Sequence, residues 1–338
     1  MSCKTPQRQH PLVLFASFII IIAGMRTAQE IVAPILLAIF IAVIAAPAVF
    51  WLQNKGLPRL VAFFMVALGV VGILSIMVIM IGNALDTFIS QLPNFQDRLM
   101  SLLQKANAFF PNNGAEIDFL QTPEYLQPAQ LLSTTTSILR SLSKLLSSSF
   151  LIFLIVAFIL FETTSLRVKM RLLLGNDSKE TEGIMNFIEN LKHYLLIKSI
   201  SSLATGIIIG LLLWVFGVKY AILFGLIAFL LNYIPAIGSI VASIPAILVS
   251  LIEYDTSTTV AVIAIFLVVN VLIGNILEPR FLGKGLGLSP LVVLLSLIFW
   301  GWVLGPIGMF LAVPITMSIA MALHTLPHTK WIAILLSS

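Results

Sequence analysis

The sequence predicts an all-α polytopic membrane protein with about eight transmembrane helices, some of them broken or re-entrant in the carboxy-terminal half. Hydrophobic residues make up 59% of the 338 residues and charged residues only 10%, against roughly a quarter charged in soluble domains. Apolar runs near the ~20 residues that a bilayer requires recur along the chain. One hydrophilic region, residues 86–146, separates them and predicts an extracytoplasmic helical insert.

The amino-terminal part, residues 1–85, is predicted to contain three transmembrane helices. They correspond to the apolar runs 12–25, 31–52 and 60–85. The first run follows Lys4 and Arg8 and so has the charge pattern of a signal peptide. No small-x-small cleavage site follows it, and we expect it to be retained as the first helix.

The insert, residues 86–146, has apolar residues at alternating spacings of four and three on two candidate helices, which is the pattern of a heptad seam. Its members are Phe88, Leu92, Phe95, Leu99, Leu102, Ala106 and Phe109, and then Leu131, Thr135, Ile138, Leu142 and Leu145. A proline-rich loop separates the two helices. The seams either pack the two helices together outside the membrane or join them to other subunits.

The carboxy-terminal part, residues 147–338, is predicted to be the transport region. A span at about 150–161 leads into a basic segment, 162–199, which we expect to be a cytoplasmic loop. Spans at about 200–216 and 258–277 flank the run 221–251, which is too long for one straight helix. Two further runs, 291–304 and 309–323, flank the turn Gly305-Pro306-Ile307-Gly308.

The basic residues predict that both termini are cytoplasmic. With eight spans, eleven of the nineteen Lys and Arg residues lie on the inner side, six of them in the segment 162–199, which includes Lys198. Four lie in short outer loops, namely Arg26, Lys219, Arg280 and Lys284, and four lie in the insert. Short loops rich in Lys and Arg stay inside. A re-entrant run 221–251 would instead place Arg280 and Lys284 inside. We therefore attribute the formal charge of +5 to basic residues that set the orientation of the protein in the membrane, and we expect no nucleic-acid partner.

The stretch Asn270–Pro314 combines an apolar background with charged, amide, glycine and proline residues. Backbone broken by Gly or Pro is tolerated at membrane depth only where protein or a water-filled cavity covers it. A similar pattern, I-G-x-x-x-A followed by a proline, begins at Ile237 and again at Ile307. Paired breaks of this kind indicate a transport site, although close helix packing also uses such glycines. The predicted helix breaks or hinges are Pro245, Gly283, Pro290, Gly305, Pro306, Gly308 and Pro314.

The candidates for binding a solute or ion lie at the two breaks: Asn232, Pro235, Gly238, Asn270, Asn275, Glu278 and Arg280. An ionisable residue at the membrane is a functional candidate because its charge is costly there. Glu278 is expected to take a proton or cation and Arg280 to hold the solute; the alternative is an ion pair at the membrane surface. The asparagines can bind sodium or hydroxyl groups, or join helices. Trp300 and Trp302 are expected to be interfacial anchors.

The sequence gives no indication of an enzyme. Its histidines, at 10, 193, 324 and 328, lie outside or at the edges of the spans, where none can serve an intramembrane serine nucleophile. The single cysteine, Cys3, excludes an internal disulfide and a cysteine metal cluster, and no HExxH motif is present. We expect no metal site and no cofactor beyond a transported or coupling H⁺ or Na⁺, and no ATP-binding motif occurs.

Two long motifs resemble the AI-2E family of transporters. They are NYIPAIGSIVASIP, from Asn232, and NILEPRFLGKGLGLSPLVVLLSLIFWGWVLGPIGMFLAVP, from Asn275. The resemblance covers nearly the whole chain. It implies a secondary transporter of the inner (plasma) membrane that exports a small polar solute such as the quorum-sensing molecule autoinducer-2, or exchanges sodium or lithium for protons. It also implies a homo-oligomer in the bilayer, with a pentamer as the suggested size.

Overall fold

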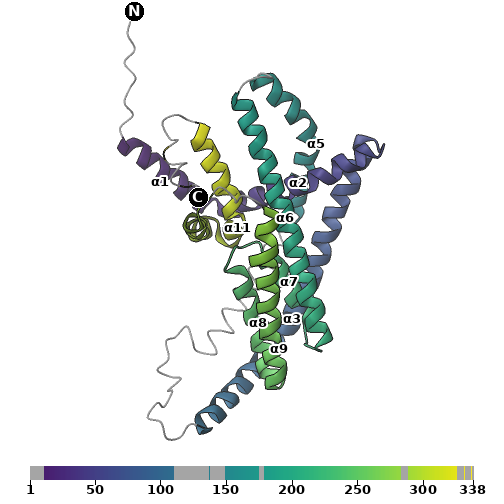
Figure 1. Ribbon diagram of the computed structural model, residues 1–338, viewed down its shortest axis with the longest axis vertical. Helices are drawn as coiled ribbons and strands as arrows, with labels where there is room; N and C mark the ends of the chain where they lie inside the picture. The colour runs from purple at the N-terminus through teal and green to yellow at the C-terminus, as the bar shows by residue number, and fades with distance from the viewer. Residues whose placement is uncertain are drawn as a thin grey trace, which may run out of the picture.

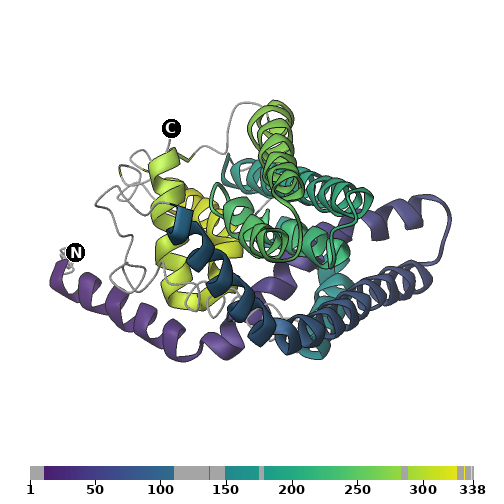
Figure 2. The ribbon, with the colours of Figure 1, turned by 90° about the horizontal axis from the view of Figure 1, so that it is seen from below.

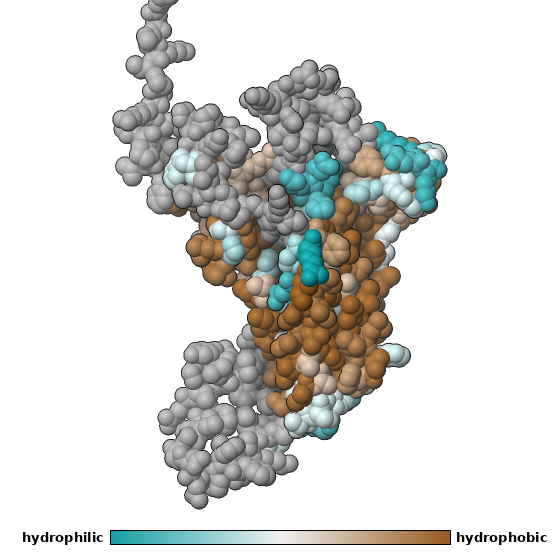
Figure 3. All heavy atoms as spheres, viewed as in Figure 1, coloured by the Kyte–Doolittle hydropathy of each residue, from teal (hydrophilic) through white to brown (hydrophobic). Residues whose placement is uncertain are grey.

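The computed structural model describes residues 11–109, 137, 149–174, 179–282, 288–325, 331 and 336. Within these ranges every regular element is a helix, which agrees with the predicted all-α class. By length and composition, five helical segments of the described residues are long and apolar enough to cross a membrane, among them Pro290–Leu323, which is broken at Gly305; four shorter apolar helices accompany them. Figure 3 shows a broad hydrophobic face with hydrophilic residues gathered towards its two ends, as expected for a protein that spans a bilayer.

The first half contains α1 (Pro11–Thr27), α2 (Gln29–Asn54), α3 (Arg59–Phe109) and α5 (Ser149–Leu174). Three of these helices, α2, α3 and α5, form one packed group, while Ile22 and Met25 of α1 pack against the larger core of the second half. One face of α2 carries small residues, Ala38, Ala42, Ala45 and Ala46, which allow α3 and α5 to approach closely and form a shared core. A hydrogen bond also joins α3 to α5: Arg59 Nη2 donates to the carbonyl oxygen of Phe161 at 2.6 Å.

The helix α3 extends without interruption to Phe109. The third predicted span and the first predicted helix of the insert are therefore one continuous helix, which Figure 1 shows descending well below the rest of the molecule. The side chains of the heptad seam on α3 and all members of the second seam lie outside the described residues. The predicted domain limits 1–85, 86–146 and 147–338 stay predictions.

The second half is built on α6 (Lys179–Val215), which packs along α7 (Ala221–Leu231). Glycines make this contact possible. A Cβ added to Gly225 would lie 2.7 Å from the carbonyl oxygen of Gly206 and 2.9 Å from the Cα of Gly210. The two backbones thus touch directly, in the small-xxx-small manner of membrane helices.

The helices α7 and α8 (Gly238–Glu253) form a re-entrant hairpin. Eleven residues make α7 only about 16 Å long, too short for a ~30 Å hydrocarbon core. The two ends of the hairpin meet on one side, where the Tyr254 hydroxyl donates to the Gly217 carbonyl at 3.0 Å. The ammonium of Lys219 lies 3.0 Å from the Glu253 carboxylate, and this hydrogen bond raises the pKa of Lys219.

The next membrane crossing is continuous and includes α9 (Thr256–Val269), the π-helix η2 (Asn270–Leu277) and α10 (Glu278–Leu282). It starts beside the hairpin ends and returns along α6, and His193 of α6 lies 3.3 Å from the carbonyl oxygen of Phe281. Because the run 221–251 turns back, Arg280 lies at the end of the molecule that carries the α5–α6 connection. The expectation that Arg280 and the segment 162–199 lie on opposite sides is therefore wrong, and the arrangement is that of the re-entrant alternative.

The last helix, α11 (Pro290–Thr325), is broken at Gly305, whose φ of 67° and ψ of −153° are not helical. The indole Nε1 of Trp300 donates to Thr316 Oγ1 at 3.1 Å. Sixteen residues of straight helix would separate these side chains by about 24 Å, so the chain folds back at the break. Trp300 is 5% exposed and is a buried link, which corrects its expected role as an interfacial anchor. Trp302 is exposed beneath the Arg26 guanidinium.

The hydrophobic interior has two parts. One lies between α2, α3 and α5. The larger one joins α6, α7, α8, α9 and α11, with Ala33 and Phe40 of α2 also contributing. Figure 2, seen from below, shows the helices of the second half gathered beside the long α3. The helix α2 thus contacts both groups and connects them.

Candidate functional site

A polar stripe on α6 lies inside the hydrophobic part of the molecule. It comprises Lys198, Ser199, Ser201, Ser202 and Thr205, which occupy one side of the helix because residues three, four and seven apart share a face. Lys198 is 5% exposed, and Ser202 and Thr205 are almost fully buried. In Figure 3 hydrophilic residues run from the upper end down into the hydrophobic face, over the region where Figure 1 draws α6 and the upper end of the helix that begins with α9.

The partner of Lys198 is Glu278. The ammonium Nζ lies 2.7 Å from Oε1, and the two side chains are only 6% and 12% exposed. The Ser201 hydroxyl contacts the other carboxylate oxygen, Oε2, at 3.1 Å. Glu278 is therefore not paired with its neighbour Arg280, which is exposed. The assignment of Lys198 to a loop is wrong, because the residue lies ten positions into the apolar segment Ile188–Val215.

The π-helix η2 positions Glu278 opposite α6. The segment begins at Asn270, and the backbone N–H of Glu278 donates to the carbonyl of Ile273, five residues earlier. A π-helical turn contains more residues than an α-helical turn, so it changes the direction of every side chain that follows it, and such segments occur frequently at functional sites. Asn275 lies on the exposed side of η2, away from the polar stripe.

The tip of the α7–α8 hairpin contacts the same stripe. The amide Nδ2 of Asn232 donates to Ser202 Oγ at 3.0 Å, and the hydroxyl of Tyr233 donates to Ser199 Oγ at 2.9 Å. Asn232 is buried, so this amide joins the tip to α6. Both predicted candidates at the tip, Pro235 and Gly238, shape the turn: Gly238 approaches the carbonyl oxygen of Leu231 so closely that a Cβ would lie 1.8 Å from it.

The second break has the same construction. A Cβ on Gly308 would lie 1.9 Å from the carbonyl oxygen of Trp300. A residue with positive φ precedes each glycine: Ala236 (62°) before Gly238 and Gly305 (67°) before Gly308. The repeated sequence pattern therefore corresponds to a repeated backbone arrangement, in which a glycine allows the second helix to pack on the end of the first.

The two broken elements meet through aromatic rings. Tyr233 at the tip of the first lies 4.3 Å, centroid to centroid, from Phe310 just beyond the second break. Phe40 of α2 contacts both, at 5.8 Å from Tyr233 and 5.2 Å from Phe310. The cluster joins the two broken elements to the helix that connects the halves of the molecule.

The structure thus brings together Asn232 and Glu278 through α6, while Asn270 starts the π-helix and Asn275 and Arg280 are exposed.

Of the predicted hinges, Gly305 is the break itself, Pro306 and Gly308 follow it, and Pro290 begins α11. Pro245 lies inside α8 and Pro314 inside α11, and both helices continue past them. Gly283 lies outside the described residues. Sequence analysis missed the serines of α6 and the role of Lys198.

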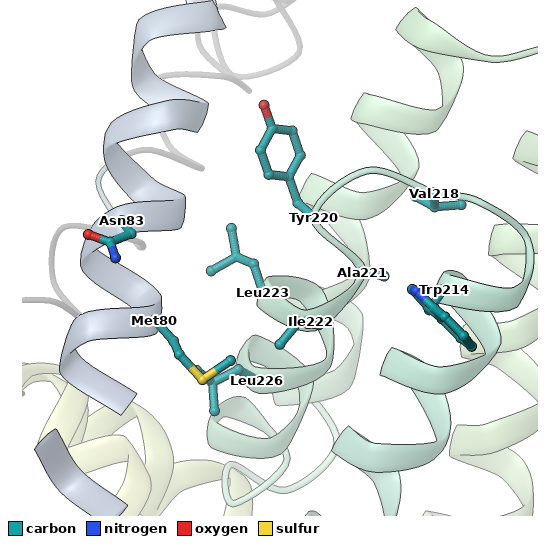
Figure 4. A pocket seen from close by; sticks show the side chains of 9 residues that line it. All are labelled: Met80, Asn83, Trp214, Val218, Tyr220, Ala221, Ile222, Leu223 and Leu226. Carbon is teal, nitrogen blue, oxygen red and sulfur yellow. The ribbon is translucent and has the colours of Figure 1, made fainter. Parts of the chain in front are cut away.

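A groove of about 460 Å³ lies elsewhere, between α3 and the α6–α7 connection. Figure 4 shows Asn83 and Met80 of α3 facing Tyr220, Leu223 and Leu226 across it. Its lining contains no charged side chain and none of the predicted site residues. In the described part of the chain no group of three or more His, Cys, Asp or Glu side chains could hold a metal ion. The polar stripe on α6 is therefore the candidate site.

The model of the family described as "AI-2E family transporter" matches residues 15–328. The chain belongs to the AI-2E transporter family. This agrees with the resemblance of its two motifs, one of which contains Asn232 and Gly238 and the other Glu278 and Gly308.

The relatives within this family are named as transport proteins. The chain is 37% identical to the AI-2 transport protein TqsA of Escherichia coli, over 96% of this chain and 95% of TqsA. It is 35% identical to the putative transport protein YhhT of the same organism, over 98% of this chain and 97% of YhhT. A putative transport protein of Haemophilus influenzae is also 35% identical, over 96% of this chain and 95% of that protein.

Proposed function

We propose that this protein is a secondary transporter that exports a small polar solute, such as autoinducer-2, from the cell across the inner membrane and uses an ion gradient to do so. The name of TqsA supports this solute, and export would give the protein a part in quorum sensing. The observation that carries the proposal is the buried polar network of α6, which joins Glu278 to the tip of a re-entrant hairpin. Buried polar groups of this kind in a membrane protein usually mark a solute or ion pathway.

The polar groups suit a neutral, hydroxyl-rich solute. Asn232 and Ser202 together offer an amide and a hydroxyl, and Tyr233 and Ser199 offer two hydroxyls. Each pair now hydrogen-bonds internally, so a solute with several hydroxyl and carbonyl groups replaces these contacts one for one. Burying a polar solute costs little when every hydrogen bond is replaced.

The moving part in this proposal is the second half, with its two broken elements. The group α2, α3 and α5 has its own core and serves as a scaffold, while the hairpin tip and α11 contact it through Phe40. Broken helices near the membrane centre, moving as a unit against a scaffold, are a common basis of alternating access. Glu278 takes up a proton during the cycle and so couples movement to the pH gradient.

A second candidate is a sodium or lithium/proton antiporter of the same family. The buried carboxylate of Glu278 favours it, since carboxylate oxygens bind both protons and hard cations. Under a third possibility, the protein has a structural or sensory role and carries nothing.

Flux measurements on purified protein in liposomes distinguish the three functions. Autoinducer-2, sodium and lithium are tested separately under an imposed pH gradient, with empty liposomes as a control. We expect gradient-dependent flux of autoinducer-2 and its loss in Glu278→Gln, which keeps the shape of the side chain and removes the titration. Flux of sodium or lithium alone would favour the antiporter, and no flux of any of the three would refute transport of these solutes.

A further inference from the structure

The carboxylate of Glu278 has a cation beside it in this structure, and that cation belongs to the chain itself. Oε1 contacts the Lys198 ammonium at 2.7 Å and Oε2 contacts the Ser201 hydroxyl at 3.1 Å. An ionised carboxylate that is 12% exposed needs such a partner, because removing one member of a buried ion pair leaves an uncompensated charge. If Lys198 moves away from Glu278, another cation must therefore take the place of its ammonium.

The chemistry of lysine permits such a replacement. Its ammonium is a compact point charge on a flexible four-carbon stem, and unlike the guanidinium of arginine it does not bind a carboxylate through a rigid two-point contact. The ammonium contacts Oε1 of Glu278, and the Ser201 hydroxyl contacts Oε2 of the same carboxylate. Carboxylate and other oxygen ligands are those that hard cations take.

We propose that Glu278 and Ser201 form a monovalent-cation site whose resident occupant is the ammonium of Lys198, so that an entering cation must displace Lys198. The proposal rests on the proposed function, because it assigns Lys198 to the ion-coupling step of the same site. It also explains why a lysine lies inside an apolar helix: the Glu278 carboxylate keeps a cation beside it when no external cation is bound, so the empty carrier has no uncompensated charge. When an external cation binds, the displaced Lys198 must release its proton to keep the site neutral, so one proton leaves for each cation that enters.

Other titratable groups lie near the pair and must be considered in any test. Tyr194, buried on α6, is within electrostatic range of Glu278, and Tyr233 of the hairpin tip contacts Ser199 next to Lys198. His193 faces the carbonyl oxygen of Phe281, and Arg280 is exposed. All variants are measured at one fixed pH, so that the pH does not differ between samples.

The first experiment measures thermal unfolding of Lys198→Met in detergent during titration with NaCl or LiCl, with choline chloride at equal ionic strength as the control. Without Lys198, the cation site has no resident competitor. We expect sodium or lithium to raise the melting temperature of the variant, at a midpoint concentration at least about tenfold lower than for the unchanged protein. The double variant Lys198→Met with Glu278→Gln lacks the carboxylate and should show no response beyond that to choline.

Three results would overturn the proposal: no cation-specific response in Lys198→Met, the same midpoint in the variant and the unchanged protein, or an equal response in the double variant. In each case the ion pair would be a structural link between α6 and α10. Lys198→Gln is a second variant with a hydrogen-bonding side chain, should the methionine variant fail to fold.

A second experiment uses the unchanged protein. Displacement should release the Lys198 amine, so its reductive methylation, measured by mass spectrometry of the peptide, should increase with sodium or lithium and not with choline. Unchanged methylation would contradict displacement. Both readouts are independent of flux. Failure of the liposome assay with a positive binding result would thus refute only the proposed function, and the reverse outcome would refute only the cation site.

Discussion

Replacement of Gly238 or Gly308 by alanine tests the construction of the two breaks. The added Cβ would lie 1.8 Å from the Leu231 carbonyl oxygen in one case and 1.9 Å from that of Trp300 in the other. Both oxygens belong to the backbone, so each break must open by more than 1 Å to reach normal contact. Overpacking typically costs about 1–3 kcal/mol, and contacts this short with backbone atoms belong at the upper end of that range, which exceeds the roughly 0.5–1 kcal/mol that alanine gains over glycine in a helix.

The expected net loss of about 2 kcal/mol or more is more than a tenfold change in the unfolding equilibrium. It is measured as a lower melting temperature in detergent by tryptophan fluorescence. Gly69→Ala and Gly72→Ala are matched controls, since both glycines lie in α3 with no atom within 4 Å of the added Cβ. These controls should melt at or slightly above the temperature of the unchanged protein. Equal melting of all four variants would refute the close backbone contacts at the breaks.

Three further predictions concern other parts of the molecule. Trp300→Phe leaves the buried hydroxyl of Thr316 without its donor and should cost about 1–3 kcal/mol; a melting temperature unchanged in detergent would contradict this link. The hydroxyls of Ser257 and Thr258 lower the pKa of Asp255 from 3.8 to about 2. This stabilisation is full above pH ~4 and is lost as the pH falls towards 2, so the stability difference between the unchanged protein and Asp255→Asn should shrink over that range and not above it. With Cys3 replaced by serine, a cysteine at Lys219 should react with an impermeant reagent from one side of the membrane and one at Arg280 from the other; reaction of both from the same side would rule out the re-entrant hairpin.

The membrane class and the positions of the breaks could be predicted from the sequence, because both depend on local composition. Proline and glycine close together in an apolar run indicate a break, so Asn232–Gly238 and Gly305–Gly308 were identified without knowledge of their neighbours, whereas the predicted breaks at Pro245 and Pro314 are continuous helix. The direction of the chain after each break could not be predicted. A short apolar helix and half of a long one look alike in sequence, and it is the contacts of Lys219 with Glu253 and of Tyr254 with Gly217 that show that the chain turns back.

The ion pair could not be predicted because it joins residues 80 positions apart. The count of basic residues assigned Lys198 to a loop, since the apolar run was taken to begin at Ile200. The signal that could have corrected this is the spacing of Lys198, Ser201 and Thr205, which lie on one face of a helical segment, Ile188–Val215, that is mostly apolar. A polar stripe within an apolar helix indicates a buried partner, and Glu278 was the charged candidate to consider.

The most direct test of transport by movement of the broken elements is a cross-link between the hairpin tip and the scaffold. Phe40 and Tyr233 have ring centroids 5.8 Å apart, so cysteines at these positions, in a protein with Cys3 replaced by serine, can be joined by a short reducible thiol cross-linker. We predict that the cross-linked protein loses flux of its solute in liposomes and that reduction restores it, while each single-cysteine variant treated in the same way keeps its flux. Full flux through the cross-linked protein would contradict movement of the tip against α2.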